Sequence, residues 1–299
     1  MKEYLLGNAA IARGILEAGA GVVTSYPGTP ASEIVESLAP VSKEYNLHIE
    51  WSVNEKVALE VAIGASWTGV RSAAVMKHVG LNVAADPFMT LAVDMGTIDT
   101  CLCMGASINL ASGIRFGGED RDICCSIGDS TFLHNGMPGL LNAVYNNAKI
   151  TVTILDNLTT AMTGHQPHPG TGVTATGDKT KSVSIEALAN VLGADFVETV
   201  DPYDLNATLE TFRKAKECQG LSVVIAKQAC ITNAIRAGVR RKPFRVNDNC
   251  VGCRECVDFG CPAIEFHEDR ARINSLCTGC SVCAQICPSE AIEEGVNVK

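Results

Sequence analysis

The sequence predicts an α/β protein with parallel sheets, followed by a small cysteine-rich α+β domain. Strand and helix patterns alternate over residues 121–157 and again over 182–230, which is typical of parallel sheets with helical crossovers. Eight of the fourteen cysteines fall in the last fifty residues, in two regular runs. The length of 299 residues allows about two domains and an appendage. We expect α/β domains at 1–95 and 96–232, a basic linker at 233–246 and the cysteine-rich domain at 247–299.

The composition is that of a globular protein. Hydrophobic residues make up 46% of the chain and charged residues 19%, which excludes a disordered or collagen-like polymer. The formal net charge of -9 argues against nucleic acid or an anionic membrane as a partner. The longest uncharged apolar stretch, 100–114, is too short to span a bilayer, and residues 1–19 have an amphipathic pattern unlike a secretory signal. We therefore expect a cytoplasmic protein without a membrane segment.

Residues 1–95 show the pattern of one α/β domain. The stretch 21–34 predicts a strand, a Pro/Gly turn and a helix, and 52–69 predicts another helix. Thr29 lies in the turn, where a threonine can cap the helix that follows. Glu55 lies near the start of the second helix, where a carboxylate commonly interacts with the helix dipole.

Residues 121–157 predict a strand, a helix and a second strand. The first strand ends in Gly128-Asp129, and the second ends at Asn157. Right-handed crossovers make such strands parallel, so Asp129 and Asn157 both emerge at the carboxyl edge of the sheet, where open α/β folds bind ligands. A carboxylate and an amide oxygen suit Mg²⁺. The residues alone leave open that both side chains only cap their own turns.

Other cysteines lie in and near this domain without a metal-binding pattern. Cys124 and Cys125 are expected to fill a buried strand as small apolar residues. The spacing of Cys101 and Cys103 is unsuited to a tetrahedral structural site. We therefore expect no metal among these four thiols.

The last fifty residues contain an internal repeat of cysteines. The first run has spacings of two, two and four residues and ends in Cys261-Pro262; the second has spacings of two, two and three and ends in Cys287-Pro288. This is the bacterial ferredoxin pattern, in which three close cysteines hold one [4Fe–4S] cluster and the fourth reaches the other cluster. The pattern assigns one cluster to Cys250, Cys253, Cys256 and Cys287, and the other to Cys277, Cys280, Cys283 and Cys261.

Zinc is the alternative for these cysteines. Zinc ribbons space two Cys-x2-Cys pairs around a longer loop, and they have no use for a third regularly spaced cysteine or for Cys-Pro. The ligand count therefore favours two iron–sulfur clusters. The extra residue between Cys256 and Cys261 enlarges one loop, which affects the geometry of that half and not the choice of metal.

The residues around Asp129 resemble a known cofactor motif. Gly128-Asp129-Ser130, followed after a gap by Asn157, resembles the thiamine diphosphate motif, which implies that Asp129, Asn157 and the backbone of Thr159 hold Mg²⁺ on the cofactor's diphosphate. Together with the stretches 99–108 and 155–172, these residues resemble the large subunit of indolepyruvate:ferredoxin oxidoreductases, a family of thiamine diphosphate-dependent enzymes.

The resemblance also implies roles for residues outside the metal motif. Gly105 lies in a segment that opens a helix beside the cofactor, where backbone N–H groups could face the diphosphate. Thr29 is implied in substrate contact, and Glu55 in hydrogen bonding to the aminopyrimidine ring of the cofactor. Glu60, five residues later, is the competing carboxyl group.

Two histidines lie in a Gly/Pro-rich loop just beyond the second strand of the metal motif. His165 and His168 are either exposed loop residues or residues with a catalytic or substrate-orienting role, for which we select His165.

The resemblance implies oxidative decarboxylation of an aryl 2-oxoacid, indolepyruvate foremost, to an aryl-acetyl-CoA, with electrons passed to ferredoxin. Coenzyme A is then a substrate and a smaller beta subunit a partner. The basic linker is mainly a solvated segment, with a docking edge for an acidic ferredoxin as the second possibility. Two alternatives stay open: an enzyme for another 2-oxoacid such as pyruvate or a branched-chain acid, and a non-enzymatic iron–sulfur electron carrier with a remnant thiamine site.

Part of the family pattern is missing from the middle of the chain. The resemblance stops near residue 93 and resumes at Asp99, so 94–97 looks like a join, and the first thiamine diphosphate-binding domain is expected to be incomplete. An incomplete sheet leaves strand edges unpaired unless a partner covers them. We therefore expect the shortened chain to keep its cluster domain, to bind thiamine diphosphate weakly if at all, and to turn over slowly.

Overall fold

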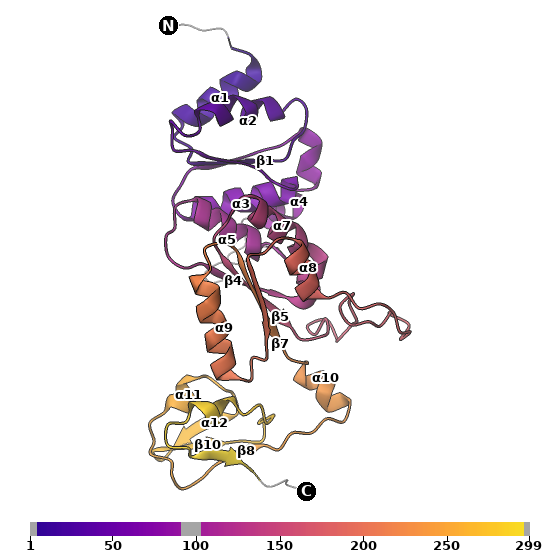
Figure 1. Ribbon diagram of the computed structural model, residues 1–299, viewed down its shortest axis with the longest axis vertical. Coiled ribbons are helices and arrows are strands. Elements are labelled where there is room, and N and C mark those ends of the chain that lie inside the picture. The colour runs from indigo at the N-terminus through magenta and orange to yellow at the C-terminus, as the bar shows by residue number, and fades with distance from the viewer. Residues whose placement is uncertain (1–4, 91–102, 296–299) are drawn as a thin grey trace.

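The computed structural model describes residues 5–90 and 103–295, and the proposed join at 94–97 lies outside them. The elements form three successive bodies along the long axis of the molecule (Figure 1). Two parallel α/β domains are followed by a small α+β domain, as the sequence predicts. None of the helices in the described ranges is both long and apolar enough to cross a membrane.

The first domain contains a three-stranded parallel sheet in the order β2-β1-β3. Val23 of β1 pairs with Ile49 of β2 and with Ala73 of β3. The helices α1 and α2 cover one face of the sheet and α3 covers the other (Figure 1). The elements are α1 (Gly7–Glu17), β1 (Val22–Ser25), α2 (Ser32–Leu38), η1 (Ala39–Val41), β2 (His48–Trp51), α3 (Glu55–Trp67), β3 (Ser72–Val75), η2 (His78–Asn82) and α4 (Ala85–Thr90).

The second domain contains a four-stranded parallel sheet in the order β4-β5-β7-β6, which confirms the alternation predicted over 121–157 and 182–230. Its main core includes residues of α5, α7 and α8 on one face, and α9 packs on β6 and β7. The elements are α5 (Ser107–Phe116), β4 (Cys124–Gly128), α6 (Asp129–Thr131), η3 (Phe132–Gly136), α7 (Met137–Tyr145), β5 (Thr151–Asp156), α8 (Ile185–Val191), β6 (Phe196–Val200), α9 (Leu205–Glu217), β7 (Ser222–Lys227) and α10 (Ile231–Arg236).

The expectation that Cys124 is buried is wrong. Cys124 is exposed and lines a cavity of about 240 Å³ near the start of β4. The reason is that α9 packs on β6 and β7, so the edge strand β4 has one open face. Cys125 points to the opposite face and packs against the main core, and burial raises the pKa of its thiol.

The two α/β domains meet where α3 packs along α5. A Cβ atom at Gly64 would collide with the backbone of Leu110, and one at Gly113 would collide with the backbone of Val61. Glycine at these two positions therefore allows the helix backbones to approach closely. This contact holds the first domain against the helix that precedes β4.

The C-terminal domain consists of two antiparallel strand pairs and two short helices. The pairs are β8 with β11 and β9 with β10. Two elements lie within the segment predicted as a linker, since α10 extends to Arg236 and β8 starts at Phe244. The elements are β8 (Phe244–Val246), α11 (Glu255–Asp258), β9 (Ile264–His267), β10 (Arg270–Ile273), α12 (Val282–Ile286) and β11 (Ile292–Glu294).

Candidate functional site

The carboxyl ends of β4 and β5 meet at Asp129. This residue is 2% exposed and directly follows β4. Its Oδ2 accepts a hydrogen bond from the backbone N–H of Leu158 at 2.9 Å, and its Oδ1 accepts one from the N–H of Ser130 at 2.7 Å. The bond to Leu158 ties the exit of β4 to the turn after β5, so the two halves of the predicted motif lie together.

The turn after β5 presents oxygen atoms beside Asp129. Asn157 Oδ1 accepts the backbone N–H of Thr159 at 3.1 Å, and Leu158 between them has a positive φ of 62°. The hydroxyl of Thr160 donates to Ser130 Oγ at 3.0 Å. Carboxylate, amide and carbonyl oxygens are the ligands that Mg²⁺ prefers, and among the described residues Asp129 Oδ1 has a single N–H partner. The donor set therefore fits a magnesium ion.

Asp156 is a second buried carboxyl group at this edge, which sequence reasoning missed. It is 5% exposed, and Lys227 Nζ lies 3.5 Å from its Oδ2. Burial raises its pKa, and the nearby charge of Asp129 acts in the same direction. Asp129 and Asp156 therefore bring two buried carboxyl groups to this edge, and the half-exposed Lys227 offsets part of the charge of Asp156. Asp156 could have been found from the sequence by its position at the end of an apolar strand, directly before Asn157.

The structure brings His168, and not His165, to Asp129. His168 is 8% exposed, and its Nε2 lies 3.2 Å from Asp129 Oδ2. His165 has a positive φ of 70°, and its Nδ1 lies 3.8 Å from the sulfur of Cys230. The role selected for His165 stays a prediction, whereas His168 contacts the metal motif directly.

Thr29, Glu55 and Gly105 lie in three different turns. Thr29 is exposed, precedes a cis Thr29–Pro30 bond and makes no cap, because the helix α2 begins without a side-chain cap. Glu55 is half-buried at the start of α3 and packs against Gly80. Gly105 has a φ of 91° and packs against Asn135. Among the residues that the structure describes, no hydrogen bond joins Thr29 or Glu55 to Asp129.

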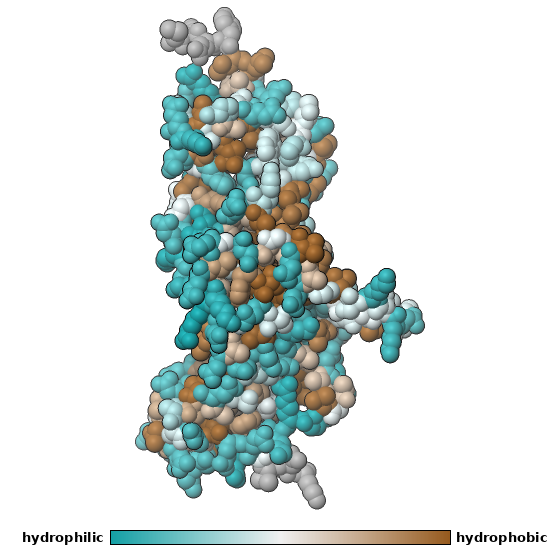
Figure 2. Space-filling model, viewed as in Figure 1, coloured by the Kyte–Doolittle hydropathy of each residue, from teal (hydrophilic) through white to brown (hydrophobic). Residues whose placement is uncertain are grey.

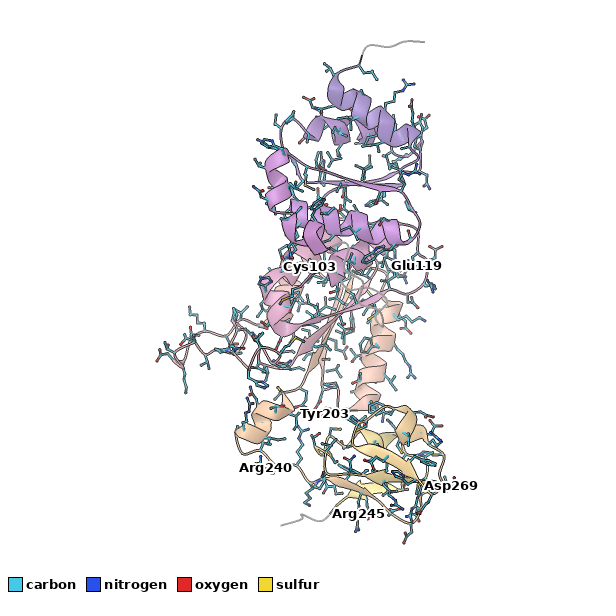
Figure 3. The ribbon with its side chains drawn as sticks, turned by 180° about the vertical axis from the view of Figure 1, so that it is seen from behind. Cys103, Glu119, Tyr203, Arg240, Arg245 and Asp269 are labelled. Carbon is cyan, nitrogen blue, oxygen red and sulfur yellow. The ribbon has the colours of Figure 1, made fainter. Side chains whose placement is uncertain are left out.

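The carboxyl group of Glu60 lies in the contact between the two α/β domains and is hydrogen-bonded there. Its side chain is 0% exposed; Oε1 accepts a hydrogen bond from the thiol of Cys103 at 3.0 Å, and Oε2 accepts one from the Asn109 amide. Figure 3 shows Cys103 beside the packed helices. Burial raises the pKa of Glu60 and also that of the Cys103 thiol. Since Glu60 accepts two hydrogen bonds and lies 3.9 Å from Lys56 Nζ, Glu55 is the freer carboxyl group of α3.

Replacing Glu60 with glutamine is expected to stabilise the chain at pH 7 by about 1 kcal/mol. The folded-state pKa of Glu60 lies above its ordinary value of 4.5, so its contribution is favourable below that value and is lost as pH rises toward the folded pKa. Glutamine stays neutral, and its amide can reach Asn109 Oδ1, which has no hydrogen-bond partner among the residues that the structure describes. Thermal unfolding between pH 4.5 and 8 should show the gain growing with pH. A variant that is less stable at every pH contradicts this account; Glu55→Gln is the matched control.

The eight C-terminal cysteines line two cavities in crossed sets. One cavity is lined by Cys250, Cys253, Cys256 and Cys287. The other is lined by Cys261, Cys277, Cys280 and Cys283. These are the two sets that the ferredoxin pattern assigns, each with three cysteines of one run and the fourth from the other run.

The surroundings of the thiols suit clusters better than single ions. Within the described ranges, no three Cys, His, Asp or Glu side chains are grouped closely enough to hold one metal ion, as zinc requires. Backbone N–H groups of Phe244 and Ala291 donate to the sulfurs of Cys277 and Cys287, both at 3.3 Å. Burial raises the pKa of Cys283 to about 11, with its three set members adding to the shift. A bound cluster would lower it, because the metal ligand is the thiolate.

The second cysteine run contacts the second α/β domain. Gln285 of α12 donates to the carbonyl of Tyr203 at 2.8 Å and accepts the N–H of Leu205 at 3.0 Å. The guanidinium of Arg241 lies 4.9 Å from the centre of the Tyr203 ring, which Figure 3 shows between α10 and the cluster domain. Lys242, just before the cluster domain, pairs with Glu294 of β11. Two cationic residues of the linker, Arg241 and Lys242, therefore interact with other residues of the chain.

Three family models match successive parts of the chain. Residues 13–92 match the pyruvate flavodoxin/ferredoxin oxidoreductase thiamine diphosphate-binding family, and 81–226 match the C-terminal TPP-binding domain of thiamine pyrophosphate enzymes. Residues 272–293 match a 4Fe-4S binding domain. The match to the iron–sulfur family covers the second cysteine run.

The curated relatives come from archaea. The indolepyruvate oxidoreductase subunit IorA of Pyrococcus abyssi is 44% identical over 220 residues, which cover 66% of this chain and 34% of the relative. The subunit of the same name from Archaeoglobus fulgidus is 45% identical over 201 residues, covering 66% of this chain and 32% of the relative. Over about two thirds of its length the chain is similar to these subunits, and its family matches are to thiamine diphosphate-binding and 4Fe-4S domains. It spans about a third of the length of these curated oxidoreductase relatives.

A solved oxidoreductase structure gives a weaker likeness. The 2-oxoglutarate:ferredoxin oxidoreductase from Magnetococcus marinus is 12% identical with a TM-score of 0.40, and the match covers 77% of this chain and 65% of that chain. This similarity is too low to place individual residues of this chain, so the site rests on its own geometry.

Proposed function

We propose that this chain takes part in oxidative decarboxylation of an aryl 2-oxoacid, with indolepyruvate as the preferred substrate, and passes the electrons to ferredoxin. The observation that carries the proposal is the presence in one chain of an Asp129-centred oxygen site and two crossed sets of four cysteines. The indolepyruvate name of the archaeal relatives supports the choice of substrate.

The oxygen site would hold Mg²⁺ and thiamine diphosphate. Asp129, Asn157 and the carbonyl of Thr159 would bind the metal, and the backbone around Gly128, Ser130 and Gly105 would lie along the diphosphate. Thiamine diphosphate supplies the electron sink that decarboxylation of a 2-oxoacid needs. Glu55 would hydrogen-bond the aminopyrimidine, which the engagement of Glu60 with Cys103 and Asn109 supports.

The cysteine sets would hold two [4Fe–4S] clusters. Their arrangement around two separate cavities supports this number, and the N–H donors to Cys277 and Cys287 would stabilise thiolate ligands. Each cluster would carry one electron at a time toward the acceptor protein.

A partner subunit would complete the enzyme. Hydrophobic side chains gather on the surface of the middle part of the molecule (Figure 2). Phe88, Leu141 and Tyr145 are among the exposed large hydrophobic residues of the two α/β domains. Exposed apolar patches commonly mark protein–protein contacts. We assign this surface to the smaller beta subunit, with coenzyme A and ferredoxin as the further reactants. A cytoplasmic location, where thiols stay reduced, fits the cysteine content.

A substrate comparison tests the proposed reaction. Viologen reduction by the chain with its partner subunit should be at least about 10-fold faster with indolepyruvate or phenylpyruvate than with pyruvate, because an aryl pocket gains the burial of a ring. The comparison also includes 2-oxoglutarate, because some relatives are named 2-oxoglutarate synthase subunits. A clear preference for pyruvate or 2-oxoglutarate would refute the aryl assignment. No reduction with any oxoacid, with intact clusters, would favour the non-enzymatic electron carrier.

A further inference from the structure

We propose that His168 is a positioning residue for the metal-binding carboxylate of Asp129. It holds the carboxylate through a neutral Nε2–H hydrogen bond, so that one oxygen stays directed to the magnesium ion. The inference rests on the proposed function, because Asp129 is a metal ligand only if Mg²⁺ and thiamine diphosphate bind at this edge.

The hydrogen bonds around the ring define its tautomer. The backbone N–H of Gly170 donates to Nδ1 of His168 at 3.1 Å, so Nδ1 carries a lone pair. The proton of the neutral ring is therefore on Nε2, which lies 3.2 Å from Asp129 Oδ2. A neutral ring with its N–H directed at a carboxylate is the arrangement that orients catalytic and metal-binding groups elsewhere.

The ring is held in place by the base of a projecting arm. The segment between β5 and α8 extends from the body of the molecule (Figure 1). Within it, His168 lies two residues before Gly170, whose carbonyl Ser182 contacts. A Cβ atom at Gly170 would lie 2.9 Å from Cε1 of the His168 ring, so glycine there makes room for the ring. Ser182 Oγ donates to the Gly170 carbonyl at 2.7 Å and closes the base of the arm.

The two carboxylate oxygens of Asp129 accept different numbers of hydrogen bonds. Oδ2 accepts both the Leu158 N–H and the His168 N–H, whereas within the described part of the chain Oδ1 accepts only the N–H of Ser130. Both donors to Oδ2 are uncharged, so they fix the carboxylate without cancelling the charge that attracts a cation. They also offset the repulsion from Asp156, whose pKa is raised mainly by burial and further by the charge of Asp129.

Loss of His168 should affect Mg²⁺ more than Ca²⁺. Magnesium requires near-ideal octahedral geometry, whereas calcium tolerates variable geometry and ligand number. A carboxylate that is free to rotate should therefore lose magnesium affinity first. A merely structural role for His168 would lower the affinity for both ions together.

The test is calorimetric titration of thiamine diphosphate into the reconstituted chain with Mg²⁺ or with Ca²⁺. His168→Ala should weaken the Mg²⁺-supported affinity by roughly 10- to 100-fold, the range for partners of metal ligands, and the Ca²⁺-supported affinity by clearly less. His168→Gln keeps an N–H donor and should recover most of the loss. His134→Ala, an exposed histidine in η3, is the matched control.

The proposal is overturned if His168→Ala binds like the parent chain, or if both ions lose affinity equally and glutamine gives no recovery. If the parent chain does not bind thiamine diphosphate with either ion, the proposed function fails and this role fails with it. Nitrogen-15 NMR of the histidine rings is an independent experiment, in which the His168 signals are assigned by their loss in His168→Gln. It should show the Nε2–H form for His168, and an Nδ1–H form would contradict the inference whether or not the cofactor binds.

Discussion

Replacing Asp129 with alanine is expected to abolish Mg²⁺-dependent binding of thiamine diphosphate. Asp129 supplies the buried carboxylate of the oxygen site, and its Oδ2 also holds the turn that carries Asn157 and Thr159. Its removal takes away a metal ligand and releases the others. Removing a partner of a ligand costs 10- to 100-fold, so losing the ligand itself should cost more than about 100-fold. Isothermal titration with and without Mg²⁺ measures this effect.

The matched control for this substitution is Asp178→Ala. Asp178 is exposed on the projecting arm, where its carboxylate accepts a hydrogen bond from the Thr176 hydroxyl. Its removal should leave cofactor affinity unchanged. If the parent chain binds tightly and Asp129→Ala binds equally well, the cofactor lies elsewhere and the assignment of the metal site is wrong.

Double substitutions of cysteines are expected to show whether each cluster is held by a crossed set or by the four cysteines of a single run. The parent chain should hold about eight irons after anaerobic reconstitution. Cys256 and Cys287 line the same cavity, so their double serine variant should lose one cluster and keep about four irons. Cys283 and Cys287 line different cavities, so that pair should lose both clusters and retain almost none.

The reverse result would contradict the crossed assignment. If ligands came from one run only, the pair Cys283 and Cys287 would remove a single cluster, and the pair Cys256 and Cys287 would remove both. Iron and sulfide analysis with EPR of the reduced proteins distinguishes the outcomes. Cys124→Ser is the control, because Cys124 is an exposed thiol of the second α/β domain and should not change the iron content.

Local sequence patterns predicted the elements that depend on local chemistry. The apolar run before Gly128-Asp129 forms β4, and the β-branched run before Asn157 forms β5. Strand exits are marked by residue type, and parallel pairing then brings both exits to one edge. The cysteine spacing likewise predicted two crossed sets, because it matches the ferredoxin pattern, in which the fourth cysteine of each run reaches the other cluster.

Contacts that depend on tertiary packing were not available from these patterns. The burial of Glu60 depends on α5 of the next domain, whose Asn109 binds its carboxylate, and the sequence of α3 alone does not show this contact. His165 and His168 lie three residues apart in one loop, and only the turn at Gly170 decides which ring reaches Asp129. Cys124 was expected to be buried because strand patterns do not show which face of an edge strand is left open.

The most direct test of the account is whether the chain's own clusters accept electrons from indolepyruvate. The reconstituted chain, with its partner subunit, Mg²⁺ and thiamine diphosphate, is mixed anaerobically with indolepyruvate and frozen for EPR. We predict a reduced-cluster signal that requires thiamine diphosphate and is absent in the Asp129→Ala chain. If dithionite gives the signal but indolepyruvate does not, the two halves are not coupled, and the chain is an electron carrier with a remnant thiamine site.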